Sequence, residues 1–272
     1  MIGRRILSAM LLYAASTSWA FAWGDAGHRM VCRVAWDELM EKPMADVKEI
    51  LGVATEEEFA ETCTWADRHL AEHPETARWH EIIVTPAARD VRAERDCSRL
   101  TSCALREIER NLAILKSGAP REERATALKF LAHFVGDVHQ PLRVGFLENR
   151  AGADLPATFL GRPTTLRRIW DTEMLDTDPA ALEAIANAYR LYTPLDRLYV
   201  EWIADLPAEW ATESLWIMRT PATGYVGNPG GLSFDETYVK QNLTVAHDRI
   251  AKAGMRLGHL LNEALREAIP RQ

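Results

Sequence analysis

Apolar residues recur along this chain at the spacing of an α-helix, and this periodicity constrains the fold more than any other feature of the sequence. The pattern is carried by Ile108, Leu112 and Leu115, by Leu128, Leu131, Val135 and Val138, and by Leu257, Leu260, Leu261 and Leu265. Side chains three or four residues apart share one face of a helix, which is the face that a core covers. Strand-like alternation is scarce, and residues 82–84 form the best short extended segment. The sequence therefore predicts a mostly α fold.

The breaks between these periodic segments separate helices rather than domains. Pro and Gly interrupt the pattern at Pro43 and in residues 117–120, 145–163 and 220–231, which we expect to be loops. No repeat, low-complexity block or Ser/Gly linker divides the sequence. With 272 residues, 47% of them hydrophobic, the chain is long enough to build a sizeable core without disulfide staples. We expect one domain, residues 23–272.

The N-terminus has the three parts of a secretory signal peptide. Two arginines at positions 4 and 5 precede a short apolar run in residues 6–15, and Ala-Phe-Ala at 20–22 is a small-residue cleavage signal. The apolar run is short for a bilayer span, although an uncleaved membrane anchor is the alternative. We expect residues 1–22 to be removed, so that the mature chain begins at Trp23, has no membrane attachment, and is periplasmic or secreted.

Charge and cysteine content narrow the function further. Removal of the leader would leave 30 basic and 39 acidic residues, a net charge of −9. Non-specific nucleic-acid binding normally needs a basic face, so any such role here requires local charge or bound metal. Export favours disulfides, and Cys97 and Cys103 are close enough in a polar loop to form one. Cys32 and Cys63 either form a second disulfide or remain two buried thiols.

The densest group of polar candidates lies at the end of one predicted helix. His133 and Asp137 are one turn apart on a helix expected to start near Arg121, so an imidazole and a carboxylate project together. This spacing suits a shared metal ion, although such pairs also serve as plain hydrogen-bonding partners. His139 lies well round the helix from His133 and is interpreted as structural, and Pro141 ends the helix.

Other positions strengthen the metal hypothesis. Asp67 follows a Trp-Ala pair and His80 leads into the apolar run, and burial of both would be costly without a shared cation. Cleavage after residue 22 would free an amine on Trp23, a short loop away from His28, and an amine with its own carbonyl chelates a metal. In the precursor this nitrogen is an amide and a poor ligand. The alternative role for Trp23 is that of an aromatic side chain that only packs.

Together these residues resemble the zinc-dependent single-strand nucleases of the S1/P1 type, whose superfamily includes bacterial zinc-dependent phospholipases C. The similarity covers nearly the whole mature chain. Its marks are Trp23-Gly24, Gly27-His28, Trp65-Ala66-Asp67, Trp79-His80, residues 133–142, Trp170-Asp171, Trp210-Ala211, Glu213-Ser214 and residues 254–257. The resemblance implies a single-domain helical fold and a zinc-dependent hydrolase of phosphoester bonds, an endonuclease for single-stranded DNA or RNA.

The resemblance also implies which residues hold zinc. A first ion would be held by Asp67, His80, His133 and Asp137. A second would be held by His28, by the amine and carbonyl of Trp23, and by Asp137, which bridges the two ions around a hydroxide. Two adjacent cations make that hydroxide available near neutral pH, so Asp67 and Asp137 are the expected catalytic carboxylates.

The sequence departs from the family pattern at a third zinc site. The pattern expects His where this chain has Arg143 and Arg167, and of that ligand set only Asp171 remains. A guanidinium stays protonated and only donates hydrogen bonds, so we expect two zinc ions and a third site that is empty or weak. In one interpretation an arginine replaces the third cation and donates to phosphate oxygens. In the other, the arginines pair with Asp171 and Glu148 and turnover is lost.

The residues that would contact a base also depart from the family. Glu81 and Ile83 follow His80 where an aromatic and a polar side chain are expected, and residues 152–154 read Gly-Ala-Asp in place of Gly-Gly-Asn. We favour an active enzyme over a decayed one because the first two metal sites are complete, and its expected activity is that of a nuclease for single strands. A phospholipase C, a 3′-nucleotidase, or a non-catalytic phosphate- or nucleotide-binding protein on the same scaffold are the alternatives. No stable protein partner is inferred.

Overall fold

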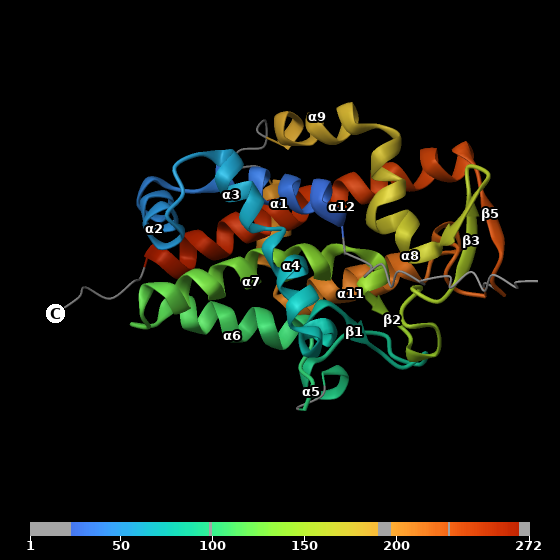
Figure 1. The fold of residues 1–272 in the computed structure, drawn as a ribbon, viewed down its shortest axis with the longest axis horizontal. Helices are drawn as coiled ribbons and strands as arrows, with labels where there is room; N and C mark the ends of the chain where they lie inside the picture. The colour runs from blue at the N-terminus through green and yellow to red at the C-terminus, as the bar shows by residue number, and fades with distance from the viewer. Residues whose placement is uncertain (1–22, 98–99, 190–196, 228, 267–272) are drawn as a thin grey trace, which may run out of the picture.

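Most of the chain is helical, which confirms the predicted fold class (Figure 1). The computed structural model describes residues 23–97, 100–189, 197–227 and 229–266, so the expected signal peptide lies outside the described residues. The α-helices are α1 (Gly24–Glu38), α2 (Glu41–Leu51), α3 (Glu56–Thr62), α4 (Trp65–Glu72), α5 (Ala93–Asp96), α6 (Ala104–Lys116), α7 (Arg121–His139), α8 (Leu166–Arg168), α9 (Pro179–Tyr189), α10 (Arg197–Ala204), α11 (Pro207–Met218) and α12 (Glu236–Arg266). Within these ranges no helix is both long and apolar enough to cross a bilayer.

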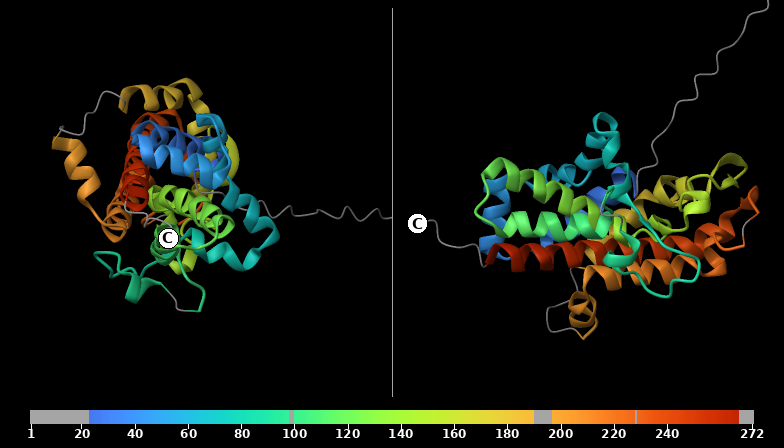
Figure 2. Two further views of the ribbon diagram at one scale, coloured as in Figure 1. Left: turned by 90° about the vertical axis from the view of Figure 1, so that its left-hand side faces the viewer. Right: turned by 90° about the horizontal axis from the view of Figure 1, so that it is seen from below.

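Helix α7 lies at the centre of the molecule. It packs along α6, and it also contacts α1, α4, α11 and α12 (Figures 1 and 2). The long helix α12 packs along α1, while α9 and α10 lie outside this pair (Figure 2). The predicted stripe Leu128, Leu131, Val135 and Val138 is fully buried, and from residue 130 to residue 139 every side chain of α7 is buried. The polar residues in this part of α7 therefore need partners inside the protein.

Two short strands lie side by side, one following His80 and the other following the end of α7. β1 (Ile82–Ile83) pairs in parallel with β2 (Val144–Gly145), with Ile82 opposite Val144. The sequence predicted the first of these extended pieces. Since β1 follows His80 and β2 follows the end of α7, the pairing holds His80 beside that end.

The stretch 145–163 is more ordered than expected. It was predicted as a loop, but it contains β3 (Pro156–Phe159) and the start of β4 (Arg162–Thr165), which form an antiparallel hairpin. β5 (Leu232–Phe234) adds to β3 in parallel, giving the order β4-β3-β5. Only tertiary structure supplies this partner strand, so local propensity underestimated the region.

Both candidate disulfides are formed. Cys97 and Cys103 pair as predicted, with Cα atoms 5.3 Å apart. Cys32 and Cys63 also pair, with Cα atoms 6.1 Å apart, which decides the question that the sequence left open. This second bridge joins α1 to the end of α3, directly before α4 begins at Trp65. It therefore ties α1, which carries His28, to the segment that leads into α4, which carries Asp67.

Candidate metal centre

Five buried imidazole and carboxylate side chains converge beside the C-terminal half of α7. They are His28 on α1, Asp67 on α4, His80 at the end of the short helix η1 (Pro74–His80), and His133 and Asp137 on α7. None of the five is more than 3% exposed. The structure thus brings together residues from four elements that span more than a hundred positions of the sequence.

The potential ligand atoms of this cluster face one another. Nδ1 of His80 lies 3.1 Å from Nε2 of His133 and 3.0 Å from Oδ2 of Asp137. Nε2 of His133 lies 3.4 Å from Oδ1 of Asp67, and Nε2 of His28 lies 3.5 Å from Oδ1 of Asp137. Two triads have ligand atoms within 4.8 Å of one another: His28, Asp67 and His133, and His80, His133 and Asp137.

Several of these atoms are buried without a hydrogen bond. They are Nδ1 and Nε2 of His28, Oδ2 of Asp67, Nε2 of His80 and Oδ1 of Asp137. Buried polar atoms are rarely left unsatisfied in folded proteins because the loss of hydration is costly. Imidazole nitrogens and carboxylate oxygens are also the atoms that zinc prefers. The donor set therefore fits one or more divalent cations.

The charges of the cluster favour a positive group between its carboxylates. Burial disfavours charge on His133, but the carboxylates of Asp137 and Asp67 outweigh it and raise the pKa of His133 to about 10. Burial likewise opposes ionisation of Asp137, but the attraction of His133 wins and holds the pKa of Asp137 well below its usual range. Burial, together with the charge of His133, lowers the pKa of His28. The cluster thus keeps carboxylates ionised where a cation would bind.

The surroundings of the cluster fix the orientation of its rings. Nδ1 of His133 lies 2.6 Å from the carbonyl oxygen of Cys63, so Nδ1 carries a proton and Nε2 faces the cluster. His28 stacks on His133 with ring centroids 3.9 Å apart. Gly136 makes room for this ring, because a Cβ at that position would lie 2.8 Å from Nδ1 of His28. Position 136 therefore needs glycine for α1 to approach α7 this closely.

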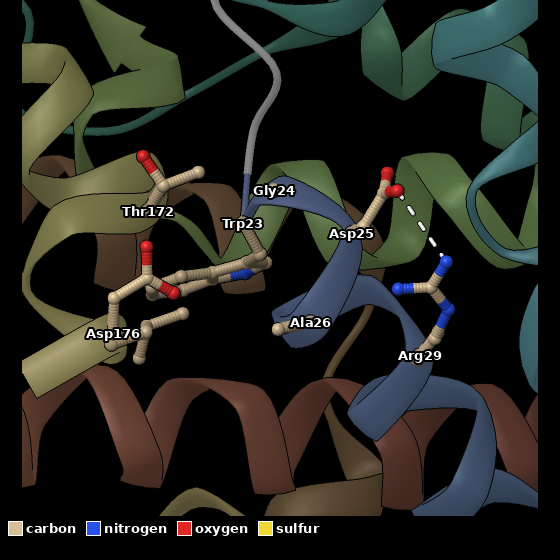
Figure 3. A pocket seen from close by; sticks show the side chains of 8 residues that line it. Trp23, Gly24, Asp25, Ala26, Arg29, Thr172 and Asp176 are labelled. Atoms are coloured by element: carbon tan, nitrogen blue, oxygen red, sulfur yellow. Dashed lines mark hydrogen bonds and ion pairs between the residues drawn. The ribbon is translucent and has the colours of Figure 1, made fainter. Parts of the chain in front are cut away.

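The expected start of the mature chain is anchored against the same helix. Trp23 is fully buried, and its indole Nε1 donates to the carbonyl oxygen of Gly136 over 3.0 Å. Gly24 has φ +55°, and a Cβ there would lie 3.0 Å from the carbonyl oxygen of Asp171. A pocket of about 380 Å³ opens beside Trp23 and is also lined by residues 24–26, Arg29, Thr172, Leu175 and Asp176 (Figure 3). Trp23 is thus held next to the turn of α7 that carries Asp137.

At the predicted third zinc position, the carboxylate of Asp171 is buried beside an amide and a guanidinium instead of imidazoles. Asp171 lies on the π-helical turn η4 (Ile169–Glu173), and its Oδ1 accepts a hydrogen bond from Nε2 of Gln140 over 2.6 Å. Its Oδ2 lies 3.6 Å from Nη2 of Arg143. Burial raises the pKa of Asp171 to about 7 although Arg143 and Arg167 oppose this shift. Gln140, which the sequence interpretation did not single out, lies in the 133–142 motif and directly follows α7.

The structure gives the two arginines different surroundings. Arg167 donates from Nε to the carbonyl oxygen of Ala151 over 3.0 Å, and from Nη2 to Oε2 of Glu81 over 3.2 Å and to the carbonyl oxygen of Arg150. The expected ion pair with Asp171 is correct for Arg143. Arg167 instead pairs with Glu81, so the expectation of Glu148 as a partner is wrong for it. Arg167 therefore holds the loop at residues 150–151 against the segment that follows His80.

His139 has the structural role that the sequence predicted. Its Nδ1 lies 2.7 Å from the carbonyl oxygen of Val135, and its Nε2 lies 2.9 Å from Nη1 of Arg256. A guanidinium only donates, so Nε2 accepts this bond and Nδ1 carries the proton. His139 thus faces α12, away from the metal cluster.

Known proteins resemble this chain over most of its length. The profile of the S1/P1 Nuclease family matches residues 23–266. Endonuclease 2 of Arabidopsis thaliana is 29% identical over 283 residues, which cover 94% of this chain and 94% of that protein. Nuclease S1 of Aspergillus oryzae is 30% identical over 284 residues, covering 95% and 97%. Nuclease P1 of Penicillium citrinum is 30% identical over 165 residues, covering 56% and 58%.

Proposed function

The chain belongs to the S1/P1 nuclease family, and on that premise we propose that it is an exported zinc-dependent phosphodiesterase that hydrolyses single-stranded DNA or RNA. The observation that carries the proposal is the cluster of five buried ligands whose unsatisfied nitrogen and oxygen atoms face one another. A net charge of −7 for the whole chain gives no general attraction to nucleic acid, so cations inside the cluster supply the local positive charge.

In this proposal the cluster holds two zinc ions. One is held by Asp67, His80, His133 and Asp137. The other is held by His28, Asp137, and the amine and carbonyl of Trp23. When bound, zinc supplies Lewis-acid chemistry, activating water near neutral pH and offsetting charge on the phosphate. The protein contributes the Cys63 carbonyl that orients His133, the room at Gly136, and the indole anchor of Trp23.

Arg143 supplies a fixed positive charge in place of a third zinc ion. Burial disfavours the charge on Arg143, but Asp171 and Asp137 outweigh it and raise its pKa, so the side chain stays cationic next to the cluster. A guanidinium donates to two phosphate oxygens at once and stabilises charge on the leaving oxygen. Nε and Nη2 of Arg167 are engaged with Glu81 and two loop carbonyls, so Arg167 acts as a positioning residue.

The flexibility of single strands favours them as the substrate. A buried metal cluster reaches a flexible backbone and an unstacked base more easily than a duplex. Processing after Ala22 and export complete the proposal, and the two disulfides support the oxidising destination. No stable protein partner forms part of it.

The first test is the zinc content of processed protein whose N-terminal residue has been verified as Trp23. We expect about two zinc ions per chain by elemental analysis, together with cleavage of single-stranded oligonucleotides. Asp137→Asn should abolish both, whereas Asp46→Asn, which removes only a surface pair with Lys42, should leave both unchanged. Full activity in a metal-loaded Asp137→Asn protein, or the absence of bound zinc in the wild type, would refute the proposal.

The arginine assignment needs its own test. Arg143→Ala should lower kcat/KM by about 100- to 1000-fold, the usual cost of removing one preorganised donor to a developing charge, with zinc content still about two. Converting both Arg143 and Arg167 to His should reduce activity if Arg143 contributes to catalysis. A gain of a third zinc together with a gain of activity would show instead a degenerate metal site.

The altered residues at the expected base-contact positions favour a second candidate function. Glu81 is engaged by Arg167, and also by Arg78 over 2.7 Å, so this side chain is committed within the protein. A smaller substrate without a bound base, as in a phospholipase C, or a 3′-nucleotide, as in a nucleotidase, is the alternative on the same scaffold. Release of phosphocholine from phosphatidylcholine, or of phosphate from 3′-nucleotides, without cleavage of oligonucleotides, would select it.

A further inference from the structure

The last turn of α7 is capped by donors from distant parts of the chain. The final four carbonyl groups of an α-helix have no partner within the helix. In α7 each of them accepts a hydrogen bond from outside the regular ladder. The donors are Nε1 of Trp23 to Gly136 (3.0 Å), the backbone N–H of Gln140 to Asp137 (3.0 Å), Oγ of Ser214 to Val138 (2.6 Å), and Nε of Arg249 to His139 (3.1 Å). This helix end is therefore held from several sides.

A buried charged group supports two of these donors. Arg249 and Arg256 on α12 are at most 1% exposed, and both donate to the carboxylate of Glu213 on α11. Nη2 of Arg249 also donates to Oγ of Ser214 over 2.9 Å. Nη1 of Arg256 lies 2.9 Å from Nε2 of His139. We call Glu213, Arg249, Arg256 and Ser214 the cap network.

Glu213 holds the cap network together electrostatically. Two guanidinium groups deep in the protein repel each other and are costly to bury without an anion. Glu213 accepts from both of them, and Asp205 accepts from Arg256 over 3.1 Å. Positive charge at a helix C-terminus is also favourable, because the helix dipole is negative there. Loss of the Glu213 charge would leave the two arginines in repulsion next to the carbonyls of the last turn.

The same turn carries the metal-facing carboxylate on its other side. Residues 137 and 139 are about 200° apart around a helix, so the cap network and the metal cluster lie on opposite faces of the turn. Asp137 faces the cluster, and Gln140 leaves this turn to hold Asp171. A shift of the His139 carbonyl would therefore also displace the side chains of Asp137 and Gln140.

We propose that Glu213 is a positioning residue for the metal centre, acting through Arg249 and the last turn of α7 on Asp137. This inference rests on the proposed zinc site. None of the contacts described for Glu213 reaches the metal cluster, so its effect passes through the backbone of α7. The residues around metal ligands typically tune affinity in this way, and their replacement costs about 10- to 100-fold in metal affinity.

The test compares Glu213→Gln with Glu56→Gln in the processed full-length protein. Glu56 is far from α7 in sequence, and it accepts a hydrogen bond from Arg33 over 2.7 Å. Glu56→Gln is therefore a control for the loss of a partly buried ion pair. Zinc affinity is measured by competition with a chelator, and site geometry by the visible spectrum of the cobalt-loaded protein. We expect an affinity loss of about 10-fold or more and an altered cobalt spectrum for Glu213→Gln alone, with partial rescue by Glu213→Asp.

Unchanged zinc affinity and an unchanged cobalt spectrum in Glu213→Gln would overturn the proposal, whatever the loss in melting temperature. If Glu213→Gln fails to fold, Arg249→Lys makes the same test, because lysine retains the charge but lacks the Nε–H that reaches His139. If the wild type binds no zinc, the proposed function fails. Amide hydrogen exchange in residues 136–140 then shows whether Glu213 positions the last turn of α7. Exchange faster in Glu213→Gln than in Glu56→Gln supports the positioning role, and equal rates overturn it.

Discussion

Uptake of the first zinc ion should release about one proton, and His133 should be its source. The pKa of His133 is raised from 6.5 to about 10, because Asp137 and Asp67 outweigh the burial that opposes its charge. At pH 7.5 only about one His133 side chain in 300 is then neutral. Zinc binds only the neutral form, so Nε2 must lose its proton before it can act as a ligand.

The size of the effect follows from the same pKa. At pH 7.5 removal of the proton from His133 costs about 3 kcal/mol, which lowers the apparent zinc affinity about 300-fold relative to the limit at high pH. The affinity should fall about tenfold for each pH unit below 10. The proton also stabilises the zinc-free fold: this contribution is complete below pH 6.5 and is lost as the pH rises through 10.

Calorimetry measures this proton directly. Zinc is titrated to less than one equivalent at pH 7.5 in three buffers of different ionisation enthalpy, and the slope of the observed enthalpy gives the protons released. The titration stops at the first equivalent because activated water releases a further proton later. His259→Gln, a half-buried histidine on α12, serves as the control and should show the same slope. A slope near zero, with zinc bound at the cluster, would refute the assigned charge of His133.

Three further predictions concern the start and the surroundings of the site. Gly136→Ala should reduce the zinc content from about two ions to about one by elemental analysis, because the new Cβ would lie 2.8 Å from Nδ1 of His28. Gly118→Ala is the control, since its added Cβ would contact nothing within 4 Å, and it should retain both ions. One extra residue before Trp23 should likewise remove one zinc, since the amine is displaced; two ions in that protein would exclude the amine as a ligand. Burial opposes the charge of Glu213, but its two arginine partners outweigh burial and lower the pKa of Glu213 to about 2. The difference in free energy of unfolding between the wild type and Glu213→Gln, measured with urea, should therefore be present above pH 4.5 and vanish as the pH falls to about 2. A difference that stays constant with pH would contradict this assignment.

The sequence predicted the parts of the fold that depend on local periodicity. The helix that carries His133 and Asp137 begins at Arg121 as expected, and its apolar stripe is buried. The expected loop at Pro43 is wrong, because Pro43 lies in the first turn of α2, where proline is tolerated. The sequence analysis also missed structure that depends on partners far along the chain. The β3–β4 hairpin lies in a segment rich in Gly and Pro, and its pairing with β5 brings together residues more than 70 positions apart. Local composition carries no information about such a partner.

The candidate site shows the same division. The spacing of His133 and Asp137 within one helix was enough to suggest a metal ligand pair, and the residues alone also pointed to His28 near the expected N-terminus. The family resemblance was needed to assign the ligands to two ions. The contact between Glu81 and Arg167 spans 86 positions and had no signal in the sequence beyond the identity of the residues. Gln140 could have been found, since it directly follows α7 within a motif already identified, and a buried polar side chain there needs a partner.

The difference between Arg143 and Arg167 shows why buried geometry decides a role that residue type leaves open. Both are 4% exposed, and both lie where the family resemblance implies histidine. Arg167 makes hydrogen bonds of 3.0 and 3.2 Å within the protein, so binding a phosphate would require breaking them. Arg143 instead lies 3.6 Å from Asp171, and its charge also interacts with those of Asp137 and Asp67 in the metal cluster. This proximity to the cluster is why we propose Arg143, rather than Arg167, as the replacement for a metal ion.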